Sequence, residues 1–473
     1  MRKIQSNALL AGGAALLAVA AGAGPASAVE LYNKDGTKFE ATFEIGLGLL
    51  HVTEDFTAAG RDSVSWSEGY AIAGFKFEHA LDANWKVFGA LTGVVNGDRG
   101  QGDAVGFSTG RDEGGQVQDA YAGLSWSDGK EGGASAKISG GRQKWVLGDG
   151  FLIAGDQPTS GADEVGPYDE GGGYYMNPRR VFSMTAILNV DTGTPWKFDA
   201  FYIESEKAFN GQLAIAGGNV DYVDAKWGTI GVTYIRGVNV EKPAFVLAPE
   251  HAGADGANIY SIHGNTSLGI KDFNIAGTYV NEQGPANPGG ANALQQAKLD
   301  AWAWYVSPSY TFSSATWTPT VYYRFASFSG DDPNTAGNES YDPLFYGATG
   351  YNTWFIGEIA ANYSGPFSQN ADVHSIGLKT APNIDVGIGK WTGMSGYINH
   401  YELREPGSFV GLAGPATSSD FGTELAIYAE FQLFENLYLS PLWSHLFTGK
   451  GYEQAYGKTD DVDNFQILGI LTY

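Results

Sequence analysis

Apolar and polar side chains alternate along a stretch of the chain that begins at Trp317. Because successive side chains of a β-strand point to opposite faces, this alternation predicts a strand with one apolar face and one polar face. A long polar segment, residues 328–346, follows it, as is typical of a lipid-facing barrel strand. A strand of a soluble sandwich also alternates, so one copy does not distinguish the two classes. The apolar set is Trp317, Pro319, Val321, Tyr323 and Phe325, and the polar set is Thr318, Thr320, Tyr322 and Arg324.

Similar segments recur along the chain, and the clearest covers residues 38–50. We count about eighteen copies, with about sixteen as the alternative, because segment ends are read only to within a few residues. Short turns such as residues 81–84 alternate with long loops such as residues 148–178. Bacterial outer-membrane barrels have this asymmetry, with short periplasmic turns and long external loops. The pattern predicts an all-β protein, namely one closed, antiparallel transmembrane β-barrel.

The first 28 residues have the features of a secretory signal peptide. A basic start at Arg2 and Lys3 precedes an apolar run over residues 8–24, and small residues at 26–28 supply a cleavage signal. A transmembrane helix is the alternative, but a run rich in Ala and Gly is only mildly hydrophobic. We therefore expect a signal peptide over residues 1–28 and a single barrel domain over residues 29–473.

Composition narrows the class of protein further. Aromatic residues make up 14% of the chain and 67 residues are Gly, which favours a β wall over helical layers. The chain has no Cys, so it contains neither a disulfide scaffold nor a thiolate metal site. Its formal net charge of −24 excludes nucleic acid as a partner.

The last strand-like segment carries a further signal. Phe465, Ile467, Leu471 and Tyr473 share one face, and Tyr473 is the final residue. An amphipathic strand that ends in an aromatic resembles the signal read by the outer-membrane barrel assembly machinery, although an ordinary closing strand is the alternative. The expected location is the outer membrane of a Gram-negative bacterium, with that machinery and outer-membrane lipid as partners.

Several basic residues occupy positions that are predicted to face the lumen. Arg or Lys on the lipid face would cost about 2–4 kcal/mol at mid-membrane, so these residues are expected inside. Inward acids such as Glu424 occur too, so the predicted lumen is polar and of mixed charge. Arg142 shares the parity of Ile138, unless the strand bulges at Gly140 and Gly141. The pore-lining candidates are Arg324, Arg142, Lys197, Lys226 and Lys137, and Lys86 and Lys379 are further inward bases.

We expect a constriction formed by Arg324 with Lys197, Lys226 and Arg142, where anionic groups of a solute bind. The acidic loop over residues 148–178 contains no Lys or Arg, and in this hypothesis it folds inward and forms the opposing wall. The alternative is that Arg324 pairs with a loop acid and holds residues 328–346 in place.

Catalytic patterns are absent from the sequence. The seven His are scattered, no His-Glu-x-x-His motif occurs, and no Gly-x-Ser-x-Gly elbow supports a hydrolase. The chain is therefore predicted not to be an enzyme and to need no cofactor. Asp331, Asp332 and Asp342 could bind Ca²⁺ through oxygen ligands, but a solvated turn capped by these side chains is the favoured interpretation.

Two stretches resemble the alginate-export family of outer-membrane porins. One is Gly141-Arg142-Gln143 followed by residues 148–155, and the other runs from Ser329 through Asp342 to Phe345. Residues 119–124 are also similar to the general bacterial porins. The resemblance implies a barrel of about eighteen strands that passes solutes through a polar lumen. It also implies a monomer, with a trimer as the alternative.

These observations predict a porin-type channel for passive diffusion of small hydrophilic solutes, either anionic or saccharide. One alternative is a dedicated exporter of an alginate-like exopolysaccharide, which would need periplasmic partner proteins. Alginate is a polyanion and the loops here are acidic, so the solute stays open. The other alternative is a structural barrel that does not conduct.

Overall fold

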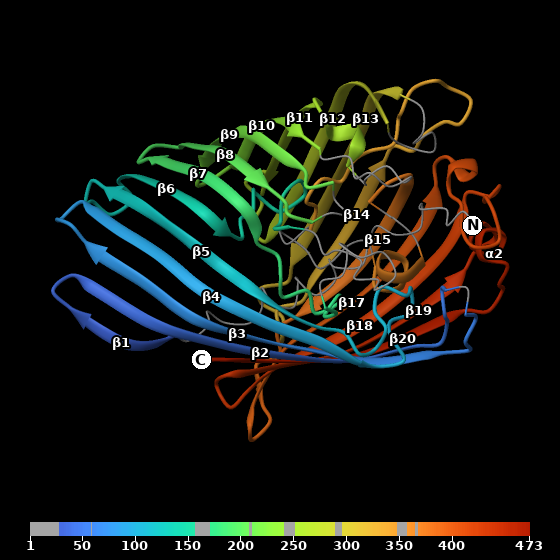
Figure 1. Ribbon diagram of the computed structural model, residues 1–473, viewed down its shortest axis with the longest axis horizontal. Coiled ribbons are helices and arrows are strands. Elements are labelled where there is room, and N and C mark those ends of the chain that lie inside the picture. Colours follow the sequence, from blue (N-terminus) through green and yellow to red (C-terminus); the bar gives the residue numbers. More distant parts are fainter. Residues whose placement is uncertain are drawn as a thin grey trace.

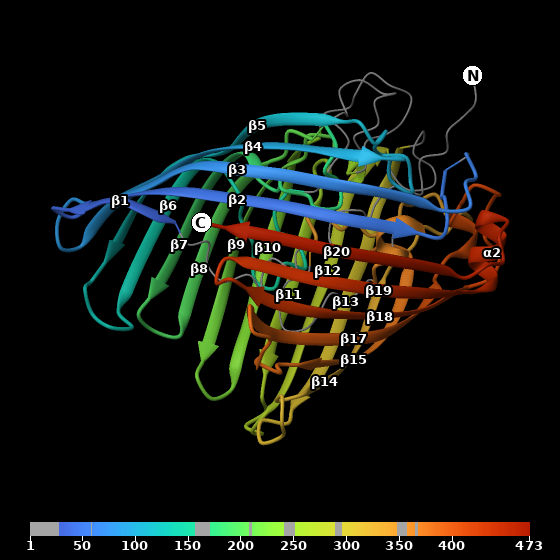
Figure 2. The same cartoon turned by 90° about the horizontal axis from the view of Figure 1, so that it is seen from below.

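A computed structural model describes residues 28–57, 59–156, 171–207, 211–240, 251–288, 296–347, 357–364 and 368–473. Its strands incline round one central lumen (Figures 1 and 2). Residues 1–27, almost all of the predicted signal peptide, lie outside the described residues. Among the described helices, none is long and apolar enough to cross a membrane.

The described strands are β1 (Val29–Lys34), β2 (Thr37–Val52), β3 (Val64–Ala80), β4 (Trp85–Gly100), β5 (Glu113–Ser127), β6 (Ala134–Gln143), β7 (Phe182–Thr192), β8 (Trp196–Glu204), β9 (Ala214–Asp224), β10 (Gly228–Asn239), β11 (Asn258–Thr266), β12 (Phe273–Pro288), β13 (Gln296–Thr311), β14 (Thr320–Phe328), β15 (Ala371–Thr380), β16 (Ile384–Asp385), β17 (Gly389–Leu403), β18 (Asp420–Leu433), β19 (Leu437–Thr448) and β20 (Val462–Thr472). The short helices are η2 (Ala252–Ala254), η4 (Ala360–Ser364), η5 (Pro406–Ser408) and α2 (Lys450–Tyr456).

Eighteen of these strands close into one antiparallel barrel, which confirms the predicted fold class and strand number. Closure joins the two ends of the domain, because residues 44–52 of β2 pair with residues 464–472 of β20. The backbones of Phe43 and Tyr473 exchange two hydrogen bonds of 2.8 Å. The short strands β1 and β16 add to β2 and β17 beyond the wall. A closed barrel pairs the backbone groups of every wall strand, as a lipid environment requires.

The alternation seen in the sequence appears as outward and inward faces. On β14, Val321 and Tyr323 are exposed on the outer face, whereas Tyr322 and Arg324 are 1% and 3% exposed on the inner face. The predicted start of this strand was wrong, since Trp317 and Thr318 lie in the turn before it with φ of 66° and 42°. That turn is closed by the Phe312 N–H, which donates to the Pro319 carbonyl at 2.8 Å.

The two ends of the barrel differ as predicted. Short turns such as residues 81–84 and 193–195 lie at the end near β1, and long loops lie at the end that carries α2 (Figure 1). We name two of the long connections by their strands. The β6–β7 loop covers residues 144–181, and the β14–β15 loop covers residues 329–370.

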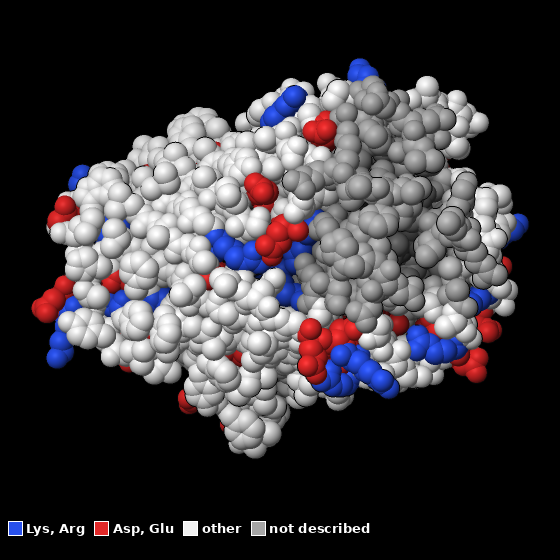
Figure 3. Space-filling view, in the orientation of Figure 1, with Lys and Arg blue, Asp and Glu red and all other residues white. Residues whose placement is uncertain are grey.

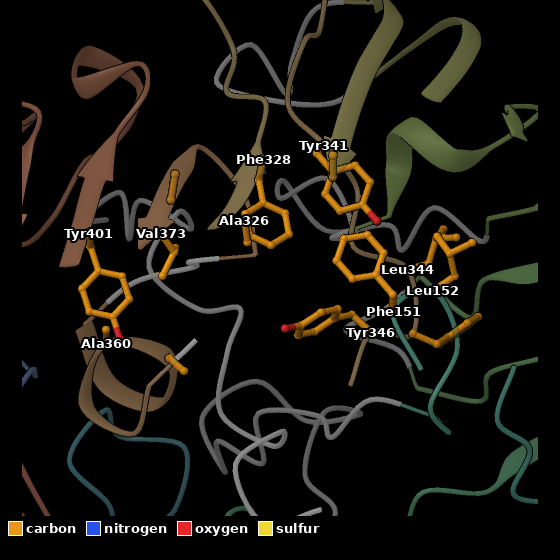
Figure 4. Close-up of a cluster of buried hydrophobic side chains, with 14 of the residues drawn as sticks. Phe151, Leu152, Ala326, Phe328, Tyr341, Leu344, Tyr346, Ala360, Val373 and Tyr401 are labelled. Carbon is orange, nitrogen blue, oxygen red and sulfur yellow. The ribbon is translucent and has the colours of Figure 1, made fainter. Parts of the chain in front are cut away.

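The hydrophobic core is formed largely by these two loops, folded against each other and against the barrel wall. Phe151 and Tyr175 of the β6–β7 loop and Tyr341 and Phe345 of the β14–β15 loop are each at most 1% exposed. Figure 4 shows Phe151, Tyr341 and Tyr346 close together. Full burial of a large apolar side chain contributes about 1.5–3 kcal/mol. The described parts of both loops are therefore packed elements of the fold.

Candidate functional site

The two infolded loops are hydrogen-bonded to each other. Ile153 and Phe345 form a parallel β-bridge. The Phe345 N–H donates to the Leu152 carbonyl at 3.1 Å, and the Ala154 N–H donates to the Phe345 carbonyl at 2.7 Å. A segment that leaves the wall after β6 thus meets the segment that follows β14.

Arg324 lies next to these loops on the inner face of β14. Its guanidinium carbon is 5.5 Å from the ring centroid of Tyr322. It also lies within electrostatic range of Asp149 in the β6–β7 loop, and the Tyr305 hydroxyl of β13 donates a hydrogen bond to Asp149. An acid of residues 148–178 thus acts on Arg324. A loop carboxylate therefore lies within electrostatic range of a wall guanidinium.

Arg142 lies at a β-bulge. From the sequence, such a bulge was required for the Arg142 side chain to leave the face that carries Ile138. Gly141 has φ of 117°, and the pairing of β6 with β7 shifts between Gly141 and Gln143. The Arg142 side chain forms an ion pair with Glu206, with one Nη1–Oε2 distance of 2.6 Å, and its Nε donates to the Val117 carbonyl at 2.7 Å. Arg142 thus links β5 and β6 to the connection after β8.

The other three predicted bases do not gather round Arg324. Lys197 is the second residue of β8, near the short turns, and pairs with Asp191 at 3.2 Å. Lys226 lies in the turn between β9 and β10, with its Nζ 4.7 Å from the Trp227 ring centroid. The Nζ of Lys137 is 4.6 Å from the ring centroid of Phe88. The structure therefore places these three lysines in separate surroundings.

Two other lysines have the surroundings expected of groups that line a channel. Lys144 follows β6 and Lys379 lies on β15; water reaches both, although protein encloses them on most sides. Neither side-chain amine forms a hydrogen bond or an ion pair within the described part of the chain. Lys379 was visible in the sequence as an inward base. Lys144 was missed, because the bulge before it interrupts the alternation.

The charged neighbours of these lysines differ. Lys144 is within electrostatic range of Arg180, Glu44 and Asp119, and Lys379 of Arg324 and Glu430. Desolvation and the nearby Arg180 lower the pKa of Lys144 to about 8. Lys144 therefore carries its charge at neutral pH and loses it under mildly alkaline conditions.

A polar network covers another part of the inner wall, from β7 to β11. The Asn219 amide donates to Asp221 at 2.9 Å, and Asp221 lies 2.9 Å from His263 Nε2. Asn189 donates to Asp199 at 2.6 Å in the same network. Figure 3 shows basic side chains gathered near the middle of that view with acidic ones beside them. The lumen is polar and of mixed charge, as the sequence indicated.

Three buried carboxylates on the wall accept backbone hydrogen bonds from the infolded loops. Glu68 of β3 accepts the N–H groups of Tyr175 and Met176 at 2.8 and 2.7 Å. Glu282 of β12 accepts the Asp342 N–H at 2.9 Å. Glu424 of β18 accepts the N–H groups that begin the segment of residues 357–364. Each is at most 1% exposed, so these contacts hold the loops against the wall.

The three aspartates proposed as a cation site bind other groups instead. Asp332 accepts the Asn334 N–H at 2.9 Å, and Asp331 accepts the Glu339 N–H at 3.2 Å. Asp342 lies 2.5 Å from His251 Nδ1. Across the described ranges, no group of three or more His, Cys, Asp or Glu side chains is placed to hold a metal ion. The structure therefore favours the capped-turn interpretation.

Comparison with known proteins identifies the fold. No protein-family model matches the chain, and no curated protein does. OpdK from Pseudomonas aeruginosa, solved with vanillate, is 13% identical, with a TM-score of 0.53 and coverage of 92% of this chain and 98% of that one. A BenF-like porin from Pseudomonas fluorescens Pf-5 is 10% identical, with a TM-score of 0.53 and coverage of 92% and 98%. OccK5 (OpdH) from Pseudomonas aeruginosa is 12% identical, with a TM-score of 0.52 and coverage of 91% and 97%.

The chain is therefore similar in fold to outer-membrane porins. At such low identity the likeness concerns the architecture alone, and it extends over nearly the whole of each chain. The narrower resemblance to the alginate-export family stays a prediction.

Proposed function

We propose that the protein is a porin of the outer membrane through which small hydrophilic solutes diffuse passively, with a preference for anions. The observation that carries the proposal is the pair Lys144 and Lys379 inside a closed barrel. Both amines are reached by water, and neither has an ion partner among the described residues. Such amines are available to the anionic groups of a passing solute. Transport of this kind needs no chemical step.

Two electric fields act on a passing ion, one from the acidic loops and one from the basic groups inside the barrel, and they differ in strength. The loops are acidic, but exposed charges more than about 10 Å away are largely screened at 0.1 M salt. Charges that line a narrow passage act at close range, with low-dielectric protein around them that focuses their field. The lumen lysines should therefore outweigh the loop acids in setting selectivity.

Arg324 has a supporting role in this proposal. It is only 3% exposed, whereas Lys379 is partly exposed and lies in its electrostatic range. We infer that Lys379 meets the solute and that Arg324 adds positive potential behind it. Arg142 and Lys197 are neutralised by their acidic partners, which weakens the hypothesis that they bind solute. The likeness to OpdK, solved with vanillate, agrees with an organic anion as solute.

Selectivity measurements test the proposal. Reversal potentials are measured in planar bilayers under a KCl gradient at pH 6.5, where Lys144 is protonated. Lys144→Gln and Lys379→Gln should each shift the reversal potential toward that of a cation-selective pore. Lys226→Gln is the matched control, because it removes a lysine from an exposed turn and should leave the potential unchanged. An equal shift in all three variants would contradict the proposal.

Two alternatives give other outcomes in the same experiment. A barrel that does not conduct would be silent in all variants. An exopolysaccharide exporter would be silent until its periplasmic partners are added. Outer-membrane lipid and the barrel assembly machinery stay the proposed partners, with a monomer as the proposed state and a trimer as the alternative.

A further inference from the structure

The start of residues 357–364 of the β14–β15 loop is bound to the barrel wall by one carboxylate, and further along the segment the Tyr363 hydroxyl donates to Asn464 of β20 at 3.4 Å. Glu424 Oε1 accepts the N–H groups of Glu358 and Ile359 at 2.6 and 3.1 Å, and its Oε2 accepts the Ala360 N–H at 3.0 Å. Glu424 is 0% exposed, and every residue of η4 is buried. The wall carboxylate thus binds the start of a buried turn of helix.

The backbone at this point allows a very close approach. Gly357 has φ of 88°, and a Cβ there would lie 2.0 Å from the Tyr401 hydroxyl and 2.4 Å from Glu424 Oε2. Any other residue would push the segment off the wall. The sequence therefore supplies a glycine where the loop meets Glu424.

A second carboxyl group is enclosed at the same place. Glu358, whose N–H binds Glu424, is itself 3% exposed, and the two side chains interact electrostatically. Tyr397 and Tyr401 of β17, Tyr428 of β18 and Tyr363 of η4 are the other titratable groups round them. Tyrosines are neutral below about pH 10. Among the described residues no Lys, Arg or His pairs with either carboxyl, so two negative charges here would have no cationic partner, and only Glu424 accepts backbone N–H groups from the segment.

We propose that Glu358 and Glu424 form a proton-sensitive latch, which holds residues 357–360 against the barrel wall when one proton is present and releases them when it is lost. Two adjacent buried carboxylates repel each other, whereas a carboxyl and a carboxylate do not. The contact of Asp342 with Glu282 is a contrasting case in the same loop. There the imidazole Nδ1 of His251 lies 2.5 Å from Asp342 Oδ1.

The direction of the pH dependence follows from the side chain that titrates. Burial and the neighbouring Glu424 raise the pKa of Glu358 from 4.5 to about 8. A carboxyl whose pKa is higher in the docked state than in the released state stabilises docking in its protonated form. This stabilisation is complete below the pKa of the released state, and it is lost as the pH rises through the pKa of the docked state. The attached state should therefore weaken from about pH 4.5 to about pH 8 and change little above that.

Hydrogen exchange of the intact barrel in detergent or lipid tests the latch. The protection of amides 358–360, corrected for the intrinsic pH dependence of exchange, should fall by up to about tenfold per pH unit between pH 5.5 and 7.5. It should then level off above pH 8. Glu358→Gln keeps the shape and removes the charge, so its protection should stay high throughout. Glu339→Gln, an acid of the same loop outside the pair, is the control and should behave as the unmodified protein.

Two results would overturn the latch. One is protection of the unmodified protein that does not change over this range, and the other is an equal fall in Glu358→Gln. Should Glu358→Gln fail to fold, the profile of the unmodified protein still decides. Hydrogen exchange is measured without any ion current. The latch proposal can therefore fail while the channel proposal holds, and the channel proposal can fail while the latch proposal holds.

Discussion

At the scale of single residues, basic side chains on the inner side of the barrel have different roles. Arg142 is bound to Glu206 and to a backbone carbonyl, so it positions strands. Lys144, two residues later, has no partner within the described ranges and is reached by water. A position facing the lumen therefore does not define a pore-lining role. A charged side chain that faces the lumen can meet a solute only if no other protein group already binds it.

The bulge at Gly141 lies directly before Arg142 and Lys144. A substitution at Gly141 tests how much its backbone conformation contributes to stability. A Cβ on Gly141 would lie 2.4 Å from the Ala120 carbonyl oxygen, at φ of 117°. We expect Gly141→Ala to lower the free energy of unfolding by about 1–3 kcal/mol, because a residue with a Cβ is strained there. Urea unfolding in detergent measures this change.

Gly140→Ala is the matched control for this bulge. Its nearest atom would be the Thr185 carbonyl oxygen at 3.3 Å, and its φ is not in the left-handed region. A loss below about 1 kcal/mol is expected, as for most mild substitutions. Equal losses in the two variants would show that the backbone conformation of Gly141 is not the cause.

At the scale of elements, the wall strands could be predicted from the sequence and the infolded loops only in part. Strands such as β14 alternate because apolar side chains face the lipid and polar side chains face the lumen. This pattern can be recognised within the sequence of a single strand. Inward folding of residues 148–178 was one hypothesis from the sequence, tied to a constriction at Arg324. Their packing against Phe345 depends on residues almost two hundred positions away, so no local pattern encodes it. The aromatic pairs Tyr174-Tyr175 and Phe345-Tyr346 were the available signal, since exposed polar loops seldom contain them.

The same physics explains what was missed at the candidate site. Glu68 and Glu282 could not be singled out from the sequence, because their partners are backbone N–H groups of distant loops. Lys144 follows a bulge, where the alternation gives no direction. Strand faces follow from local periodicity, whereas the partner of each charge follows only from the closed fold.

The contact between the two loops gives a prediction at this scale. Phe345 is 0% exposed, and its ring lies 4.8 Å from that of Phe182. Phe345→Ala should weaken the docking of the loops by about 3–5 kcal/mol, the usual range for removing a buried Phe, while the wall strands stay paired. Hydrogen exchange should then show lower protection at residues 341–346 and 150–154, and unit conductance should rise.

Phe434→Ala is the control for the loop contact. Phe434 is 65% exposed in the turn after β18, so its removal creates no cavity in the lumen. Protection of both loops should be unchanged in this variant. If Phe345→Ala also leaves both loops protected, hydrogen bonds to the wall carboxylates are sufficient to hold them.

At the scale of the whole molecule, the barrel separates an apolar outer surface from a polar interior. Leu91, Val95, Ile230 and Ile376 are each at least 56% exposed on the outer face, as expected of a surface that contacts lipid. The interior holds the charged groups and two packed loops. A soluble protein would reverse this arrangement, so the distribution itself favours a membrane location.

A pair of neighbouring substitutions on β11 tests this arrangement. Ile262 is 49% exposed at the centre of the strand, and the next residue, His263, faces inward and lies 2.9 Å from Asp221. Ile262→Lys should lower the free energy of unfolding in lipid vesicles by about 2–4 kcal/mol, because it places a charge in hydrocarbon. His263→Lys should have a much smaller effect, because the new amine faces water and can pair with Asp221. The midpoint of the heat-dependent shift in gel migration reports both. Equal stability of the two variants would mean that the outer face of β11 does not contact lipid, and the membrane-spanning interpretation would then fail.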